Sequence, residues 1–312
     1  MIKKLKLILF IVFFVYQTFA HSKTVDSNDF NPKYLSGYLS AIISQNNLNS
    51  NAAVKYFNSS KILMNKHQEF LKEYAVTLTI DGRVQKSINI IKKNSDQNNS
   101  NFFEAKLLLL IDNFKKKKFD QNIELLNEFK EYRDYDNYQY IIYEVLKSYN
   151  DLFLTKEINQ NKEKKFGNLS LINEAFQYCY LDQPEASTKF ISIINSNEGD
   201  YSRYLFFYLN TLIKKKDYNS ALQVSKSINI LDSNLLIQQS KQWIDNSNYN
   251  KFEEFFSCNN EGDILAEFFF LISNFYAADN NFKKSNFYSN ISNYLNPKFY
   301  FNSTHLLENY FK

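Results

Sequence analysis

The chain has 312 residues, of which 44% are hydrophobic and 17% aromatic, enough for two ordinary globular domains or one long repeat array. Its formal charge is +4, and three of these charges come from Lys3, Lys4 and Lys6, in a short segment without acidic residues. The rest of the chain is nearly neutral, so we do not expect it to bind nucleic acid, which requires a strongly basic surface. Only five Gly and three Pro occur, and this scarcity favours α-helices joined by short polar turns.

Residues 1–20 have the pattern of a signal peptide. The basic start is followed by an apolar run from Leu7 to Val15 and by the small-residue ending Thr18-Phe19-Ala20. The apolar run is short for a membrane-spanning helix, which needs roughly 20 residues. We therefore predict an exported protein located in the periplasm or cell envelope. The alternative is a leader that stays uncut and tethers the chain to a membrane.

Residues 21–31 are predicted to be a polar linker, and a helical array is predicted over residues 32–312. Tyr34, Leu35, Tyr38, Leu39 and Ile42 form an apolar stripe at helical spacing. A polar turn then leads to a second helix containing Ala53 and Phe57. The next pair of helices is joined by Asp81-Gly82-Arg83, and the third pair begins near Phe102.

Equivalent positions recur along this region at nearly constant spacing. The distance from Phe57 to Ile91 is 34 residues, and that from Ala186 to Ala221 is 35. The pattern is degenerate near residues 135–166, where a long helix from Tyr135 to Leu154 precedes a lysine-rich loop. It is degenerate again near residues 230–258, around the lone Trp243.

The clearest copy spans residues 263–297. A first helix from Ile264 to Ala278 is followed by the turn Asp279-Asn280-Asn281 and by a second helix that ends before Pro297. Residues 299–311 read as the first helix of one more unit whose second helix is missing.

This copy resembles the tetratricopeptide repeat. Phe269 and Tyr276 stand at the positions of its Trp and Tyr, Ser285 stands where Ala is usual, and Pro297 is the closing proline. Residues 67–94 and 168–195 resemble the repeat as well. The leader, the segment Tyr34-Leu35-Ser36-Gly37 and the later Glu261-Gly262 are also similar to exported repeat proteins of alphaproteobacteria.

The resemblance implies an all-α fold, a right-handed superhelical solenoid of antiparallel helix pairs. It also implies a scaffold that binds protein and has no catalytic activity or cofactor of its own. In such arrays the first helices line the concave side. The groove residues expected to hold a protein or peptide partner are Glu69, Lys72, Glu104, Arg203, Asn210, Glu267 and Asn274.

The two cysteines, Cys179 and Cys258, are predicted to be free thiols. In a stacked array several helices would separate them, and each layer adds roughly 8–10 Å. A disulfide needs Cα atoms closer than about 7 Å. Cys179 is expected to be buried as a small apolar residue.

We find no sequence pattern for catalysis or metal binding. His21, His67 and His305 lie far apart in the sequence, outside any metal-ligand spacing. Two lysine clusters, Lys115–Lys118 and Lys214–Lys216, stand at turns within units. They are interpreted as solvated turns that complement helix C-termini, with weak contact to a membrane surface as the alternative.

A second function remains open at this point. Helical arrays of this kind also form part of cell-wall enzymes such as lytic transglycosylases, and the present sequence would then lack the catalytic domain. Continuation of the reading frame past Lys312 would decide between the two, because more repeats favour the scaffold and a catalytic domain favours the enzyme.

Overall fold

The fold is taken from a computed structural model, which describes residues 31–67, 69–95, 100–129, 137–158, 166–196, 202–303 and 306. Within these ranges the protein is all-α, with short 3-10 helices and no β-strand. This confirms the predicted fold class at the level of secondary structure. In chain order the elements are α2 (Pro32–Asn46), α3 (Ser50–Ser59), η2 (Lys61–Asn65), α4 (Phe70–Ile80), α5 (Val84–Lys93), α6 (Phe103–Lys115), α7 (Asn122–Phe129), α8 (Asn137–Thr155), α9 (Asn168–Tyr180), α10 (Glu185–Ile194), α11 (Tyr204–Lys214), α12 (Tyr218–Ser227), α13 (Leu235–Asp245), α14 (Asn250–Phe255), α15 (Glu261–Ala278), α16 (Phe282–Leu295) and η6 (Tyr300–Ser303).

The helix boundaries follow the predicted ones closely. The long aromatic helix expected over 135–154 is α8, and the two irregular helices around Trp243 are α13 and α14. Helix α15 begins three residues earlier than predicted, at Glu261. The reason is local, because the side chain of Asn260 accepts a hydrogen bond from the backbone N–H of Asp263 at 3.1 Å and caps the helix there.

One turn geometry joins the two helices of each pair. A residue with positive φ ends the first helix, and the next residue's N–H donates to the carbonyl five residues before it. This is the hydrogen bond of a Schellman motif, which satisfies carbonyls left over at a helix end. The left-handed residues in these seven turns are Leu48, Gly82, Lys117, Asp182, Lys216, Ser247 and Asn280. Their spacing of 34 residues from Leu48 to Gly82, and of 35 to Lys117, matches the spacing read from the sequence.

Small or short polar residues lie buried where the second helix of a pair meets the first. Ala53, Ser87, Asn122, Ala221 and Ser285 are all inaccessible to solvent. The Ser87 hydroxyl donates to the carbonyl of Ala75 at 2.7 Å, and the Ser285 hydroxyl lies 3.1 Å from that of Ser273. Serine therefore occupies the usual alanine position without leaving its hydroxyl unpaired.

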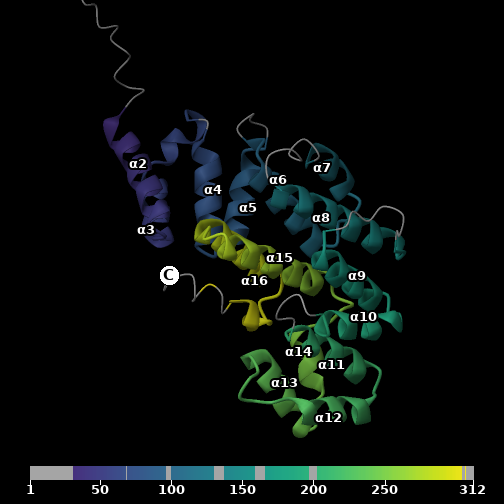
Figure 1. Ribbon diagram of the computed structural model, residues 1–312. Coiled ribbons are helices and arrows are strands. Elements are labelled where there is room, and N and C mark those ends of the chain that lie inside the picture. The colour runs from purple at the N-terminus through teal and green to yellow at the C-terminus, as the bar shows by residue number, and fades with distance from the viewer. Residues whose placement is uncertain are drawn as a thin grey trace, which may run out of the picture.

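The chain doubles back after α14. Successive helices up to α12 form a curved row, and α15 and α16 run back across the inside of the curve (Figure 1). Helix α16 packs against α4, α5 and α6, and α15 packs against α6. The amide of Asn290 on α16 donates to the carbonyl of Ile80 on α4 at 2.8 Å, which joins residues 210 positions apart. The last helix pair is therefore packed against the first part of the chain.

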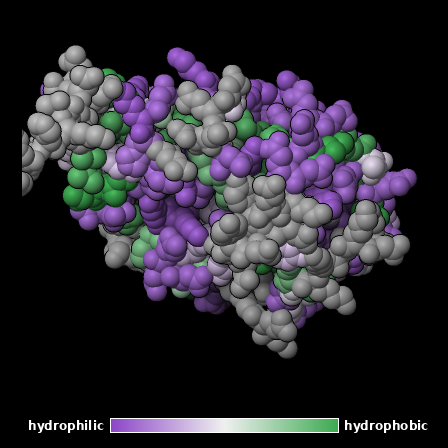
Figure 2. All heavy atoms as spheres, turned by 90° about the horizontal axis from the view of Figure 1, so that it is seen from above, coloured by the Kyte–Doolittle hydropathy of each residue, from purple (hydrophilic) through white to green (hydrophobic). Residues whose placement is uncertain are grey.

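The visible surface in Figure 2 is mostly hydrophilic, with a hydrophobic patch at the end that carries α2 and α3 and further hydrophobic patches elsewhere, including the opposite end. None of the helices in the described ranges is long and apolar enough to cross a membrane. The predicted leader and most of the linker, residues 1–30, lie outside the described residues. The final predicted helix begins instead as the 3-10 helix η6, and nearly all of its remainder also lies outside them.

Candidate functional site

The seven predicted groove residues lie on the first helices of their pairs or just before them, and only some of them contact one another. Arg203 and Glu267 bind each other, and Asn210 binds the segment before α15. Glu69, Lys72 and Glu104 lie at the N-terminal ends of α4 and α6. Asn274 belongs to the later half of α15.

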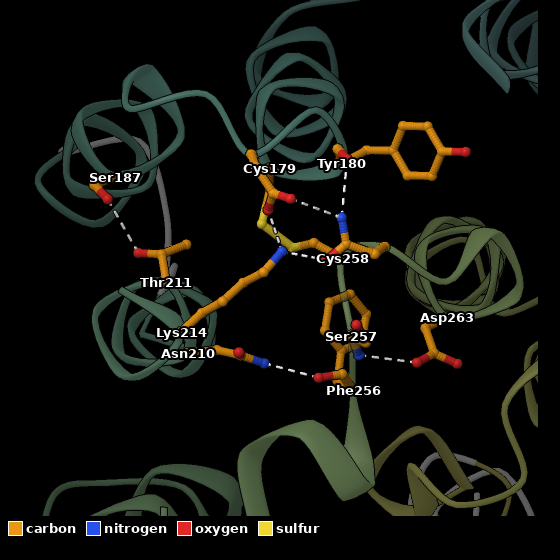
Figure 3. The surroundings of a disulfide bond; sticks show 12 residues. Cys179, Tyr180, Ser187, Asn210, Thr211, Lys214, Phe256, Ser257, Cys258 and Asp263 are labelled. Carbon is orange, nitrogen blue, oxygen red and sulfur yellow. Dashed lines mark hydrogen bonds and ion pairs between the residues drawn. A yellow bond between two sulfur atoms is a disulfide. The ribbon is translucent and has the colours of Figure 1, made fainter. Parts of the chain in front are cut away.

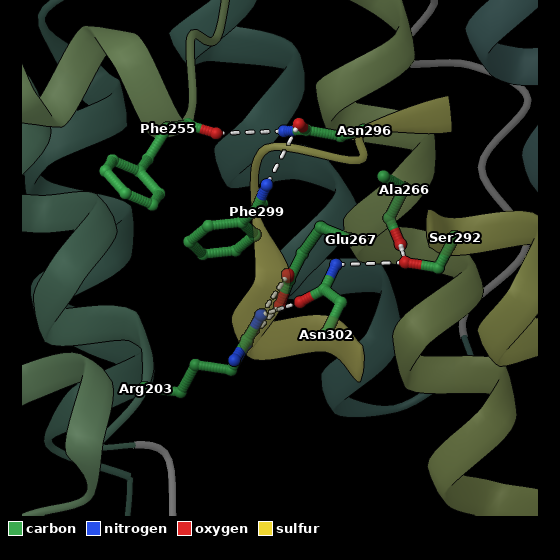
Figure 4. A network of polar contacts seen from close by, with 8 residues as sticks. All are labelled: Arg203, Phe255, Ala266, Glu267, Ser292, Asn296, Phe299 and Asn302. Carbon is green, nitrogen blue, oxygen red and sulfur yellow. Dashed lines mark hydrogen bonds and ion pairs between the residues drawn. The ribbon is translucent and has the colours of Figure 1, made fainter. Parts of the chain in front are cut away.

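Arg203 and Glu267 form a buried ion pair between α15 and the residue just before α11 (Figure 4). Arg203 Nε and Nη2 each donate to a carboxylate oxygen of Glu267 at 2.7 Å, and no part of Glu267 is exposed. Arg203 Nη2 also donates to Asn302, whose amide donates to Ser292 Oγ at 2.9 Å. The guanidinium lies 4.1 Å from the ring centroid of Phe270. In this structure both predicted groove residues hold the C-terminal helix pair in place.

The prediction of two free thiols is wrong, because Cys179 and Cys258 form a disulfide with a Cα–Cα distance of 5.6 Å (Figure 3). A simple stack of helix pairs would keep the two cysteines apart, but this chain turns back after α14. The segment between α14 and α15 passes beside the end of α9, 79 residues earlier in the sequence. Cys179 is buried as predicted.

Hydrogen bonds on both sides of this disulfide also hold the segment between α14 and α15 against the earlier helices. Asn210 Nδ2 donates to the carbonyl of Phe256 at 2.9 Å, and Asn259 Nδ2 donates to the carbonyl of Tyr180 at 3.2 Å. The Tyr180 hydroxyl donates to Glu261 Oε1 at 2.9 Å, and burial together with this carboxylate raises the pKa of Tyr180. Burial opposes ionisation of Glu261, but hydrogen bonds from Lys117, the backbone and Tyr180 outweigh it and lower the pKa of Glu261.

The two lysine clusters also contact the protein itself. Five of their side chains pair with acids, hydroxyls, amides or aromatic rings, some on the same helix and some on other helices or in loops. The pairs are Lys115 with Tyr294, Lys116 with Asp112, Lys117 with Glu261, Lys214 with Asp182 and Asn259, and Lys215 with Ser187. These contacts fit the interpretation of the clusters as helix-end charges, and they add links to the returning segment.

Charged side chains of both signs gather where α4, α6 and α16 meet, and we call this group the inner charged cluster. Its members are Glu69, Lys72, Glu73, Glu104, Lys283 and Lys284. Lys283 Nζ lies 3.6 Å from Glu73 Oε2 and donates to Gln45 Oε1 at 2.7 Å, which ties α16 to both α4 and α2.

The cluster contains one carboxyl group with a perturbed pKa. Burial raises the pKa of Glu104, while the charges of Lys72 and Lys284 partly oppose this effect and that of Glu73 adds to it. At its outer edge the Lys72–Glu69 pair is open to solvent, with 39% and 54% of the two side chains exposed and an N–O distance of 3.8 Å. The cluster therefore contains a buried carboxyl group, Glu104, and an exposed ion pair, Lys72–Glu69.

Asn274 lies at the same end of the molecule as this cluster. Lys117, just beyond the end of α6, pairs with Glu261 at the start of α15 at 2.9 Å, so the two helices run antiparallel. The start of α6, with Glu104, is thereby placed near the later half of α15. The Oδ1 of Asn274 is buried and has no hydrogen-bond partner among the described residues. This amide oxygen can therefore accept a hydrogen bond from a donor on a bound partner.

Sequence reasoning missed Glu73, Lys283 and Lys284. The two lysines lie on the second helix of a pair, which the repeat pattern assigns to the outer side. Only the return of α16 beside α4 places them on the inner side. The sequence contains no local signal for that return.

No group of His, Cys, Asp or Glu within the described ranges is arranged to hold a metal ion. Comparisons of the chain with protein-family models, with curated proteins and with solved structures find no significant match.

Proposed function

We propose that this protein is an exported, non-catalytic scaffold of the tetratricopeptide type, a superhelical array of helix pairs that binds a protein or peptide partner in the periplasm or cell envelope. The observation that carries the proposal is the recurrence of one left-handed turn at intervals of 31 to 35 residues, with one longer interval of 65 residues that contains α8. Six of the seven turns are followed by a small or short polar residue that is buried on the next helix, and the exception is α14, where Phe252 is buried instead. Repeated helix pairs of this kind expose extended surfaces that bind partners.

The disulfide supports export. Disulfides persist in oxidising compartments such as the bacterial periplasm and are rare in a reducing cytosol. Cys179 and Cys258 are bonded in the structure, and both are buried. Together with the basic and apolar start of the sequence, this pair favours an oxidising location.

We assign the partner contact to the inner charged cluster and not to the whole inner side. The inner side around Arg203 and Glu267 is filled by α15, whose Glu267 has no exposed area. The cluster keeps Glu69 and Lys72 open to solvent at its edge. Exposed charges of both signs suit recognition of a polar or charged segment, because they select orientation and reject partners of the wrong charge pattern.

A polarity swap tests this assignment. In the double variant Glu69→Lys/Lys72→Glu the two residues still form an ion pair and the net charge is unchanged, but the direction of the pair is reversed. We expect wild type to recover a specific envelope protein, identified by mass spectrometry and then bound as a purified protein. The swap should weaken that binding about tenfold, while Lys251→Glu/Glu254→Lys, a matched pair on α14, should leave it unchanged. Recovery of no specific partner would contradict the scaffold proposal, and equal binding by both swaps would contradict the site.

Export is tested separately by the state of the cysteines. In the full chain, unfolded in denaturant so that burial does not protect the thiols, we expect Cys179 and Cys258 to resist alkylation until a reductant is added. A variant that lacks residues 1–20 and stays in the cytoplasm should be alkylated at once. Free thiols in the full chain as isolated from cells would contradict an oxidising location.

A further inference from the structure

We propose that the outer face of α2, α3 and η2 docks on an anionic lipid surface. This inference is independent of the partner contact described above and concerns a different part of the molecule. It rests on exposed apolar side chains, on the charge of the surrounding residues and on the direction in which nearby acids face.

The first helix pair leaves large apolar side chains in water. The exposed fractions are 52% for Leu39, 62% for Ile43, 44% for Tyr56 and 53% for Ile62. Leu39 and Ile43 are one helical turn apart and so lie on one face of α2. The opposite side of α2, with Tyr38, Ala41 and Gln45, is buried. Hydrophobic surface at this end of the molecule is visible in Figure 2.

The same segment is purely basic. Residues 31–66 contain Lys33, Lys55, Lys61 and Lys66 and no Asp or Glu, so they carry as much positive charge as the formal +4 of the whole chain. Among the described residues no acid forms an ion pair with Lys33, Lys55 or Lys61.

Asp81, just after α4, accepts a hydrogen bond from Ser50 of α3 at 3.0 Å and pairs with Arg83, and two further acids lie on the α4 side of α2. Glu69 and Glu73 act on Tyr38, where burial first and then these two charges raise the pKa of the phenol. Tyr38 packs toward α4, with its ring centroid 5.7 Å from that of Phe70. Glu73 also pairs with Lys283 on the inner side. Lys33, Lys55 and Lys61 therefore have no acidic partner among the described residues.

This combination fits a bilayer interface better than a protein. Apolar side chains enter the boundary between head groups and acyl chains, while lysines reach anionic head groups, and no matching pocket is required. A second copy of the chain is disfavoured, because two such faces would bring like charges together. Docking at this end leaves the inner charged cluster free for a partner.

The test uses the chain purified after export and vesicles of phosphatidylcholine with or without phosphatidylglycerol. We expect sedimentation with the anionic vesicles only, weakened by added salt. Changing Lys33, Lys55 and Lys61 to Gln should reduce binding about fivefold for each lysine. Leu39→Ser/Ile43→Ser should reduce it about tenfold or more. Because all variants share one N-terminus, any contribution from residues 1–30 cancels in these ratios.

The matched control is Ile230→Ser/Leu231→Ser, which removes two exposed apolar side chains from the loop between α12 and α13. It should leave vesicle binding unchanged. Equal binding to neutral and anionic vesicles, or an equal loss in this control, would overturn the proposal. Binding to polyglutamate that depends on the lysines, without binding to vesicles, would assign the face to an acidic protein and also overturn it.

A second measurement does not depend on loss of binding. Ile43→Trp places an indole in the proposed contact, and Leu231→Trp places one in the control loop. Each variant also keeps the native Trp243, which is buried and serves as a constant background. Anionic vesicles should shift the emission of Ile43→Trp to shorter wavelength and leave that of Leu231→Trp unchanged. The same shift in both variants would be evidence against this face.

Discussion

The first and last helix pairs are built from the same unit, yet their burial is opposite. Helix α2 packs on one side only and exposes Leu39 and Ile43. Helix α16 is buried from Ser285 to Ser292 without interruption, although most of these eight residues are polar. The first pair lies at one end of the curved row, and the last pair runs across its inside (Figure 1). Position in the fold, and not hydropathy, therefore sets which helix is buried.

Short polar side chains make the burial of α16 feasible. Ser273 on α15 lies within 3.1 Å of the Ser285 hydroxyl and 2.5 Å of the Ser289 hydroxyl. Ser292 donates to the carbonyl of Ala266 at 2.6 Å. Small side chains let the two helices approach closely, and each hydroxyl finds a partner, so the cost of an unpaired buried polar group is avoided.

The largest expected loss of stability comes from breaking the buried ion pair that involves α15. Breaking an exposed ion pair on α4, near the first helix pair, should cost much less. Arg203→Met leaves the buried carboxylate of Glu267 without its partner and should lower the free energy of unfolding by about 3–5 kcal/mol. Lys72→Met, in the exposed pair with Glu69, should cost about 1 kcal/mol or less. Urea unfolding followed by circular dichroism measures both. Similar losses in the two variants would show that Arg203 does not hold α15.

Two isoleucines, one on α16 and one on α2, allow the burial of the last and first helix pairs to be compared through apolar packing alone. Ile291 on α16 is fully buried, and Ile291→Ala should cost about 2–5 kcal/mol because it leaves a cavity. Ile43 on α2 is mostly exposed, and Ile43→Ala should change the free energy by about 0.5 kcal/mol or less. The shift in urea midpoint is the readout. If Ile43→Ala were as costly as Ile291→Ala, the exposed face of α2 would be covered in solution.

The disulfide links the segment before α15, the first helix of the last pair, to α9. The first helix pair contains no cysteine. Cys258→Ser should lower the free energy of unfolding by about 2–4 kcal/mol, because the unfolded chain regains the freedom of a 79-residue separation. Treatment of wild type with a reductant should give the same value. A reductant that leaves the unfolding curve of wild type unchanged would argue against this bond as a stabilising link.

The smallest effect concerns pH. Burial raises the pKa of Asp263, at the start of α15, to about 6, despite the hydrogen bond from the Ser257 backbone. The folded state therefore holds this proton more tightly than the unfolded state, whose carboxyl group titrates near 3.8. The resulting stability is fully present below the unfolded pKa and is lost as pH rises through the folded pKa.

Between pH 4 and pH 7 this contribution should amount to about 2 kcal/mol. Asp263→Asn keeps an oxygen for the Ser257 N–H and should remove that part of the pH dependence. Unfolding in urea at a series of pH values compares the variant with wild type. Parallel pH profiles would exclude Asp263 as the source.

The local parts of the fold could be predicted because their causes are local. Asp81-Gly82-Arg83 and Asp279-Asn280-Asn281 mark turns by their own backbone preferences, and the structure has left-handed residues at Gly82 and Asn280. The members of the proposed partner site could be predicted only in part. Glu69, Lys72 and Glu104 follow from their place on first helices, whereas Lys283 joins them through a contact with Glu73, 210 residues away in the sequence.

The sequence by itself determined that the chain is all-α, where its helices pair and which small residues lie between them, because helical periodicity and turn chemistry act over a few residues. Only the tertiary structure decided that α15 and α16 return to the inside of the curve. That return brings Cys258 to Cys179 and Glu267 to Arg203. Such contacts depend on the summed direction of many helices, which no single stretch of sequence encodes.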